Sequence, residues 1–194
     1  MKKYTTVLTA LAILISLVSC TQKKTGQDNS EESAQANKIL VAYFSATGTT
    51  QKVANELGNI FDATVFEIEP VEPYTTEDLD WRDSTSRSTI EMKKDTSIRP
   101  QIKNKVPDIA QYDIILLGYP IWWYVAPTII NTFIEENNLK GKTVYCFATS
   151  GGSPIAPCVE KLKTQYPNIK WKEGKLLNNP TTTELEDWKK EILN

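Results

Sequence analysis

The feature that most constrains the fold of this chain is a repeated alternation between short apolar runs and longer segments with helical apolar spacing. Residues 39–44, 114–117 and 144–148 are nearly continuous apolar runs, typical of strands that are covered on both faces. Residues 65–69 and 169–172 mix charged with apolar side chains, as half-exposed edge strands do. The alternation predicts an α/β fold with a parallel sheet. The burial pattern predicts a doubly wound, three-layer α/β/α arrangement of five strands in the order 2-1-3-4-5.

Four segments between and after these strands have apolar side chains at helical spacing. The last is predicted to begin at Thr183, with Glu186 three residues later completing a capping box. The four apolar stripes are Val53, Leu57, Ile60 and Phe61; Ile129, Ile130, Phe133 and Ile134; Val159, Leu162 and Tyr166; and Leu185, Trp188 and Ile192.

Residues 70–111 are long for a single connection and are predicted to hold a helical segment over residues 76–94. Their charges are unevenly distributed, with acids crowded between Glu67 and Asp83 and bases in excess from Arg87 to Lys105. We interpret this order as a solvated face whose two halves partly neutralise each other, with a docking surface as the alternative.

The start of the chain resembles a bacterial lipoprotein signal. Lys2 and Lys3 precede an apolar run over residues 7–18, which is too short to span a bilayer, and the run leads to Cys20. The resemblance implies lipid attachment at Cys20, export, and anchoring to a bacterial membrane in the cell envelope, outside the cytoplasm. An ordinary signal peptide and an uncleaved anchor are the alternatives. The predicted organisation is a signal peptide over residues 1–19, the lipidated cysteine and a flexible tether over residues 20–37, and one domain over residues 38–194.

The composition excludes several kinds of chemistry. The chain contains no histidine, which rules out Ser-His and Cys-His nucleophile pairs and histidine zinc ligands. A formal charge of −2 argues against nucleic acid as the partner. Three cysteines cannot form a disulfide framework, so Cys146 and Cys158 are expected to be buried and inert, with a disulfide or a redox role for Cys158 left open. A bound cofactor is therefore the expected source of any chemistry.

The loop after the first strand has the composition of a phosphate receptacle. In a doubly wound sheet, ligands bind beyond the carboxyl ends of the strands near the point where the strand order reverses. Hydroxyl groups, a glycine and the free amides of a helix start suit a phosphate, whereas the missing lysine and Walker spacing disfavour a nucleoside triphosphate. A polar turn with a helix cap is the alternative. The loop residues are Ser45, Ala46, Thr47, Gly48, Thr49 and Thr50.

Two further strand ends carry candidate ligand-binding loops. The third strand runs into Pro120, Ile121, Trp122, Trp123 and Tyr124, where an exposed indole could stack on a flat aromatic ligand. The fourth ends in Thr149, Ser150, Gly151 and Gly152, which could offer backbone amides to the edge of a ring. Core filling and a plain turn are the respective alternatives.

The three loops together resemble those of the flavodoxin family, and the resemblance covers residues 38–194. Residues 45–50 match the phosphate-loop pattern Ser/Thr-x-Thr-Gly-x-Thr. The resemblance implies that FMN is the cofactor, with Ser45, Thr47 and Thr50 on its phosphate and Trp122, or alternatively Trp123, against the isoalloxazine. Many flavodoxins carry a second aromatic residue in the later loop, but residues 149–155 hold none. The outer flavin face is therefore expected to be open, or covered by Tyr124 or by a residue of the 70–111 segment.

The function that this resemblance implies is FMN-dependent electron transfer to a redox partner protein or a small electron acceptor, with no catalytic side chain required. An FMN-dependent NAD(P)H:quinone-type oxidoreductase is the first alternative. A flavodoxin-shaped binding module that has lost its flavin is the second.

Overall fold

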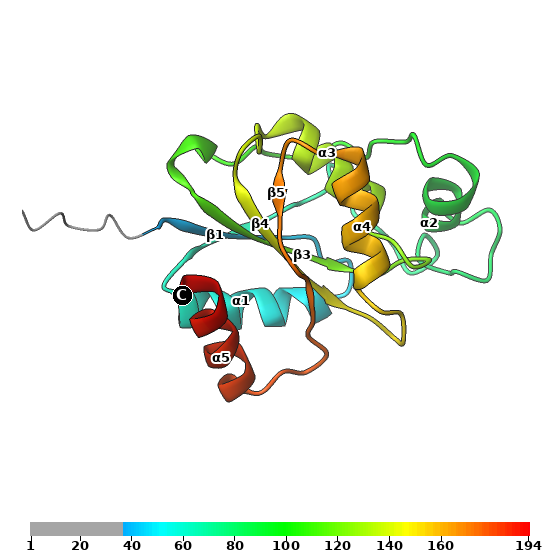
Figure 1. The fold of residues 1–194 in the computed structure, drawn as a ribbon. Coiled ribbons are helices and arrows are strands. Elements are labelled where there is room, and N and C mark those ends of the chain that lie inside the picture. The colour runs from blue at the N-terminus through cyan, green and yellow to red at the C-terminus, as the bar shows by residue number, and fades with distance from the viewer. Residues whose placement is uncertain (1–36) are drawn as a thin grey trace, which may run out of the picture. The chain divides into compact units, whose positions relative to one another are not determined.

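The computed structural model describes residues 37–194 and contains a parallel sheet with helices on both faces (Figure 1). The strand order β2-β1-β3-β4-β5 confirms the predicted doubly wound topology, and a sixth strand, β6, pairs with β4. The predicted signal peptide and Cys20 lie outside the described residues. The strands are β1 (Ile39–Tyr43), β2 (Thr64–Glu67), β3 (Ile114–Pro120), β4 (Thr143–Thr149), β5 (Lys170–Trp171) and β6 (Lys175–Leu176). The main helices are α1 (Thr49–Phe61), α3 (Thr128–Glu136), α4 (Ala156–Gln165) and α5 (Thr182–Leu193).

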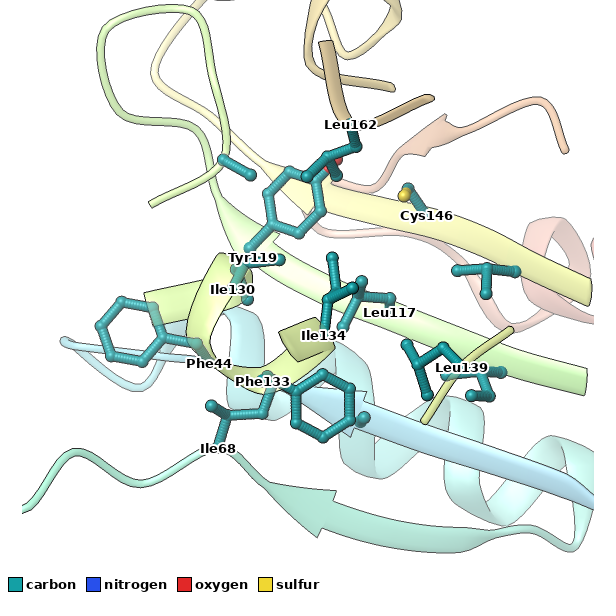
Figure 2. Packing of buried hydrophobic residues seen from close by; sticks show 14 of the residues in the cluster. Phe44, Ile68, Leu117, Tyr119, Ile130, Phe133, Ile134, Leu139, Cys146 and Leu162 are labelled. Atoms are coloured by element: carbon teal, nitrogen blue, oxygen red, sulfur yellow. The ribbon is translucent and has the colours of Figure 1, made fainter. Parts of the chain in front are cut away.

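The side chains of the inner strands divide between two hydrophobic cores. Val41 of β1 packs in a cluster with residues of α1 and α5, whereas its neighbours Leu40 and Ala42 join a larger cluster with residues of α3 and α4. Successive strand residues point to opposite faces of the sheet, so each helix pair covers one face. Figure 2 shows the larger core, in which Ile134 of α3 lies beside Leu117 of β3 and Ile130 lies near Tyr119. Both cores pack against β1, β3 and β4, whose carboxyl ends lie at one edge of the parallel sheet.

At the sheet edge beside β4 the structure has two short strands, β5 and β6, where the sequence predicts a single strand over residues 169–172. β5 pairs with the start of β4, through Val144 and Trp171, and β6 pairs with its end, through Phe147 and Lys175. The edge chain uses one more residue than β4 between these pairs, as in a β-bulge. Gly174 lies in the gap, where a Cβ atom would be 2.8 Å from a Val159 methyl group. Only glycine lets the edge chain approach α4 this closely.

The predicted helix over residues 76–94 is mostly wrong. Helical structure is confined to α2 (Arg87–Thr89) and the π-helical turn η1 (Ile90–Lys94), and the preceding residues form turns. The Ser86 side chain caps α2 by accepting a hydrogen bond from the Thr89 amide. The segment before Ser86 has too few apolar side chains to bury a helix face, so local side-chain turns prevail over the helix. A short 3₁₀ turn, η2 (Ile109–Gln111), leads into β3.

The capping box of the last helix forms two residues earlier than predicted. Thr181, not Thr183, accepts from the Glu184 amide, and the Glu184 carboxylate accepts from the Thr181 amide at 2.8 Å. Two overlapping Thr-x-x-Glu patterns are present, and the earlier one adds further residues to the helix without changing which face is buried. Among residues 37–194, none of the helices is both long and apolar enough to cross a membrane.

Candidate functional site

A cleft of about 790 Å³ opens at the carboxyl ends of the inner strands. It brings together all three loops that the sequence singles out, and of their predicted site residues only Gly48 and Gly152 are not part of its wall. The predicted residues that line it are Ser45, Ala46, Thr47, Thr49, Thr50, Pro120, Ile121, Trp122, Trp123, Tyr124, Thr149, Ser150 and Gly151. The other lining residues are Leu79, Trp81, Ser88, Ser153, Asn178 and Asn179.

The first loop exposes the amino end of α1 to the cleft. Gly48 precedes the helix with φ of 82°, a left-handed conformation that favours glycine, and its carbonyl accepts the first helical bond from the Lys52 amide at 3.2 Å. No side chain caps this helix, and its first turn carries no acidic residue. The amides of the first turn are therefore free to bind an anion, and the helix dipole favours one there.

A buried hydrogen bond joins the first loop to the third. The hydroxyl groups of Thr50 and Thr149 lie 2.8 Å apart, and both residues are buried. If Thr149 donates in this pair, the hydrogen of Thr50 remains free for an acceptor in the cleft. At the mouth of the same loop, the hydroxyls of Thr47 and Thr49 lie 3.3 Å apart and are exposed. The loop thus presents several hydroxyl donors beside the free amides.

The second loop is a tight hairpin with an unusual backbone. Trp122 and Val125 exchange backbone hydrogen bonds of 3.0 Å, and the two residues between them, Trp123 and Tyr124, have φ of 45° and 67°. Two consecutive positive φ values are those of a type I′ turn, which normally holds asparagine or glycine. Large aromatic residues in this conformation are strained, and such strain persists where the surrounding structure holds it for a function. The hairpin presents both aromatic side chains to the cleft.

Trp122 is held by edge-on aromatic contacts. Its ring makes T-shaped contacts with Phe44, at a centroid distance of 5.6 Å, and with Tyr74, at 5.3 Å. The guanidinium of Arg87 lies 3.9 Å from the centroid of the Tyr74 ring. These contacts fix the indole while leaving it in the wall of the cleft.

A buried carboxylate supports this aromatic group from behind. Glu91 is only 3% exposed and accepts from the Tyr74 hydroxyl at 2.6 Å and from Arg87 Nε at 2.7 Å. Burial, together with the hydrogen bond to Glu91, raises the pKa of Tyr74 above its usual range, so Tyr74 stays a neutral donor. Most charged residues of the 70–111 segment are exposed, as expected for a solvated face, and Lys103 of the basic half pairs with Glu69 of the acidic half. Glu91 is the exception, because it is buried and has a structural role.

The third loop is positioned by a residue that the sequence interpretation missed. Asn178 accepts from the Ser150 amide and donates to the Ser150 carbonyl, both at 2.8 Å, so its side chain pairs with the loop as a strand backbone would. The Ser150 hydroxyl accepts from the amides of Gly152 and Ser153 at 3.1 and 2.7 Å. Several of the amides that were expected to face a ligand are thus already bonded within the protein.

Two signals could have found the missed residues. Asn178 and Asn179 follow β6 at the same sheet edge as the other loops, but the interrupted edge strand hid that strand end in the sequence. Trp81 is a large apolar residue within an acidic turn-rich segment, which is an unusual place for an indole to lie without a contact to make.

Cys146 and Cys158 are both free and buried. The Cys158 thiol donates to the Tyr124 carbonyl at 3.2 Å and so braces the strained hairpin. Burial raises the pKa of Cys158 to about 11 and that of Cys146 to about 12, which makes both thiols unreactive at neutral pH. No cluster of potential metal ligands occurs within the part of the chain that the structure describes.

The comparisons with known proteins agree with this geometry. The flavodoxin family model matches residues 38–192. A solved protein from Bacteroides eggerthii, provisionally assigned as a flavoprotein, is 51% identical; the match covers 80% of this chain and 97% of that one, with a TM-score of 0.77. A similarly assigned protein from Bacteroides uniformis is 49% identical over 79% of this chain and 98% of its own, with a TM-score of 0.76.

A more distant structure shows the same fold. A flavoprotein from Lactobacillus acidophilus, solved in complex with FMN, is 24% identical over 79% of this chain and 99% of its own, with a TM-score of 0.63. The comparison with curated proteins gave no significant match.

Proposed function

Because the chain belongs to the flavodoxin family, we propose that it binds FMN in the cleft and works as an electron-transfer flavoprotein. The observation that carries the proposal is the convergence of three features on one cleft: the free amides of α1, the strained aromatic hairpin and the loop held by Asn178. An anion site next to an aromatic wall suits a phosphorylated planar cofactor.

The residues present fit the phosphate of FMN. The uncapped first turn of α1 offers amide donors without a nearby acid, and Thr47 and Thr50 add hydroxyl groups that line the same cleft. Gly48 removes the side chain where the loop turns back into the helix. These groups would bind the phosphate end and set the direction in which the rest of the cofactor extends.

The aromatic hairpin fits the flavin end. Trp122 is fixed by Phe44 and Tyr74, and Trp123 and Tyr124 stand beside it in the cleft wall. When bound, FMN supplies the electron chemistry, whereas the protein supplies stacking, hydrogen bonds and local charge that set its redox properties. The electron acceptor or donor would be a redox partner protein or a small molecule.

The experiment that tests this proposal compares FMN with riboflavin, which lacks the phosphate. Titrations followed by flavin fluorescence should show one FMN per chain, bound at least about a hundredfold more tightly than riboflavin, since charge-assisted bonds to a phosphate are among the strongest in proteins. Thr47→Ala should reduce this preference. Thr164→Ala removes an exposed hydroxyl of α4 that bonds only to the Glu160 carbonyl and should leave the preference unchanged.

Two outcomes would contradict the proposal. If the folded protein bound neither flavin, the cleft would serve another ligand, as in a flavin-free binding module. If it bound FMN and riboflavin equally, the first loop would not be a phosphate site.

We further propose that the protein is exported and anchored through a lipid on Cys20. Support comes from the basic start, the short apolar run and the cysteine that follows it. In cells, the wild-type protein should incorporate radiolabelled fatty acid and fractionate with membranes. Cys20→Ala should abolish the label and release the protein from the membrane pellet; membrane association that survives this change without the label would indicate an uncleaved anchor instead.

A further inference from the structure

The aromatic wall of the cleft rests on an ion pair that belongs to none of the three loops. Arg87 lies in α2 and Glu91 four residues later in η1, a spacing that places both side chains on one face of the helical segment. The Glu91 carboxylate is buried. Since a buried ion pair contributes little net stability compared with apolar residues of similar size, its presence here is better explained by the geometry that it imposes on its neighbours.

Glu91 uses a separate oxygen for each of its two partners. Oε1 accepts from Arg87 Nε at 2.7 Å, and Oε2 accepts from the Tyr74 hydroxyl at 2.6 Å. Both partners are donors, so an amide at position 91, with one oxygen and one NH₂ group, would meet only one of them in this geometry. A carboxylate holds Tyr74 and Arg87 at the same time.

The Tyr74 ring is oriented by this pair. The Arg87 guanidinium lies over one face of the ring, 3.9 Å from its centroid, and Arg87 Nη1 donates to the Glu72 carbonyl at 2.8 Å. With its hydroxyl held by Glu91 and one face covered by Arg87, the ring has both a fixed position and a fixed plane.

Trp122 takes its orientation from two aromatic neighbours of different origin. Phe44 directly follows β1, and its amide donates to the Gly118 carbonyl at 2.9 Å, so the sheet itself fixes its place. Tyr74, which meets the Trp122 ring at an angle of 77°, comes instead from the irregular segment between β2 and β3. The orientation of Trp122 therefore depends on Tyr74, and through it on Glu91 and Arg87.

We propose that Tyr74, Glu91 and Arg87 are positioning residues for the flavin end of the cleft, because together they set the plane in which the Trp122 indole meets the isoalloxazine. None of the three lines the cleft, so they act through Trp122 and not on the cofactor directly. This inference rests on the proposed function. Because the phosphate loop is not involved, loss of the unit should affect FMN and riboflavin equally.

The chain contains a second unit of the same chemistry, which provides a matched control. Glu135 accepts from the Tyr166 hydroxyl at 2.6 Å and from Arg99 Nε at 2.9 Å. Glu135 lies in the last turn of α3 and Tyr166 directly follows α4, whereas the cleft loops precede both helices. None of these residues lines the cleft. Removal of the tyrosine hydroxyl is thus the same chemical change in both units, with different expected effects on flavin.

The first test measures flavin affinity by fluorescence titration. Tyr74→Phe should weaken FMN and riboflavin binding by the same factor of about five, the lower end of the loss when an aromatic stacking partner is removed. The preference for FMN should then be that of the wild type, in contrast to Thr47→Ala. Tyr166→Phe should change neither affinity. Glu91→Gln should weaken both at least as much as Tyr74→Phe, which keeps the ion pair and remains a test if Glu91→Gln fails to fold.

The second test needs no flavin and measures the indole itself. NMR of the indole N–H groups in the flavin-free protein gives one signal for each tryptophan, and Trp122→Phe identifies the signal of Trp122. Tyr74→Phe should shift or broaden this signal, because the ring that orients the indole is no longer held at its hydroxyl. Tyr166→Phe should leave it unchanged. A general loss of stability would not single out Trp122 in this way.

The outcomes separate this inference from the proposed function. If the wild-type protein bound neither flavin, both would be overturned. If it bound FMN and Tyr74→Phe bound it equally well, the positioning role alone would be refuted. Equal weakening by Tyr74→Phe and Tyr166→Phe would show a general effect on stability, and weakening of FMN without riboflavin would place the effect at the phosphate; either result would also refute the positioning role.

Discussion

The strained aromatic hairpin makes a prediction whose sign is opposite to the usual effect of glycine. Tyr124 has φ of 67° and is 64% exposed, so its replacement removes little packing. Two variants, Tyr124→Gly and Tyr124→Ala, both remove the ring but differ in the Cβ atom. In the left-handed conformation the Cβ atom of alanine lowers the free energy of unfolding by about 1–2 kcal/mol. Glycine lowers it by about 0.4–1 kcal/mol, because it gives the unfolded chain more conformational freedom.

The difference leaves Tyr124→Gly more stable than Tyr124→Ala by about 0.5–1 kcal/mol. Urea denaturation of the protein without added flavin measures it. With a slope of roughly 2 kcal/mol per molar for a domain of this size, the midpoints should differ by roughly 0.25–0.5 M.

The control is the same pair of substitutions at Glu186, an exposed position within α5. There glycine should be less stable than alanine by about 1 kcal/mol, so the sign should reverse between the two sites. If Tyr124→Gly were no more stable than Tyr124→Ala, the hairpin would store no backbone strain and the argument from its φ values would fail.

Three further predictions follow from single contacts. Gly48→Ala should destabilise the protein by about 1 kcal/mol, because alanine is strained at the left-handed φ of this position, and should weaken FMN binding in the fluorescence titration. Asn178→Ala removes two hydrogen bonds to Ser150 and should cost about 1–3 kcal/mol in urea denaturation; an unchanged midpoint would mean that the loop holds its position unaided. Cys146 and Cys158 have folded pKa values of about 12 and about 11 against about 8.5 in an unfolded chain, so stability should be independent of these thiols below pH 8 and should fall as the pH rises above about 8.5. Ellman's reagent at pH 8 should leave both thiols unmodified in the folded protein and modify both in denaturant.

The fold could be predicted because its strongest signals are local. The continuous apolar runs of β1, β3 and β4 mark strands that are covered on both faces, and the charges in residues 65–69 and 169–172 mark edges; together these set the strand order. The interruption of the edge strand at Gly174 could not be foreseen, since it depends on how closely the chain approaches Val159. The capping box was predicted at Thr183 and Glu186 but forms at Thr181 and Glu184. Both pairs fit the Thr-x-x-Glu pattern, and the sequence alone does not show which of them forms.

The sequence could predict the site residues that the strand order alone brings together. It could not predict those that reach the site through contacts between distant parts of the chain. The three loops lie at strand ends, so the sheet order alone places them together. Trp81, by contrast, reaches the cleft through a long irregular segment with no periodicity to locate it. Asn178 acts by pairing with Ser150, a partner that is distant in sequence, and no local pattern reveals such a pair.

The broken edge strand also bears on how neighbouring copies of this protein meet. An open strand edge is a template on which a second chain can add, and that addition begins aggregation. Here β5 and β6 are two residues each, separated by a bulge with Lys172 and Glu173. The opposite edge, β2, has only four residues and is largely exposed. Neither edge of the sheet has a long, flat run of free backbone groups. Edge-to-edge pairing between copies is therefore disfavoured, even at high local concentration.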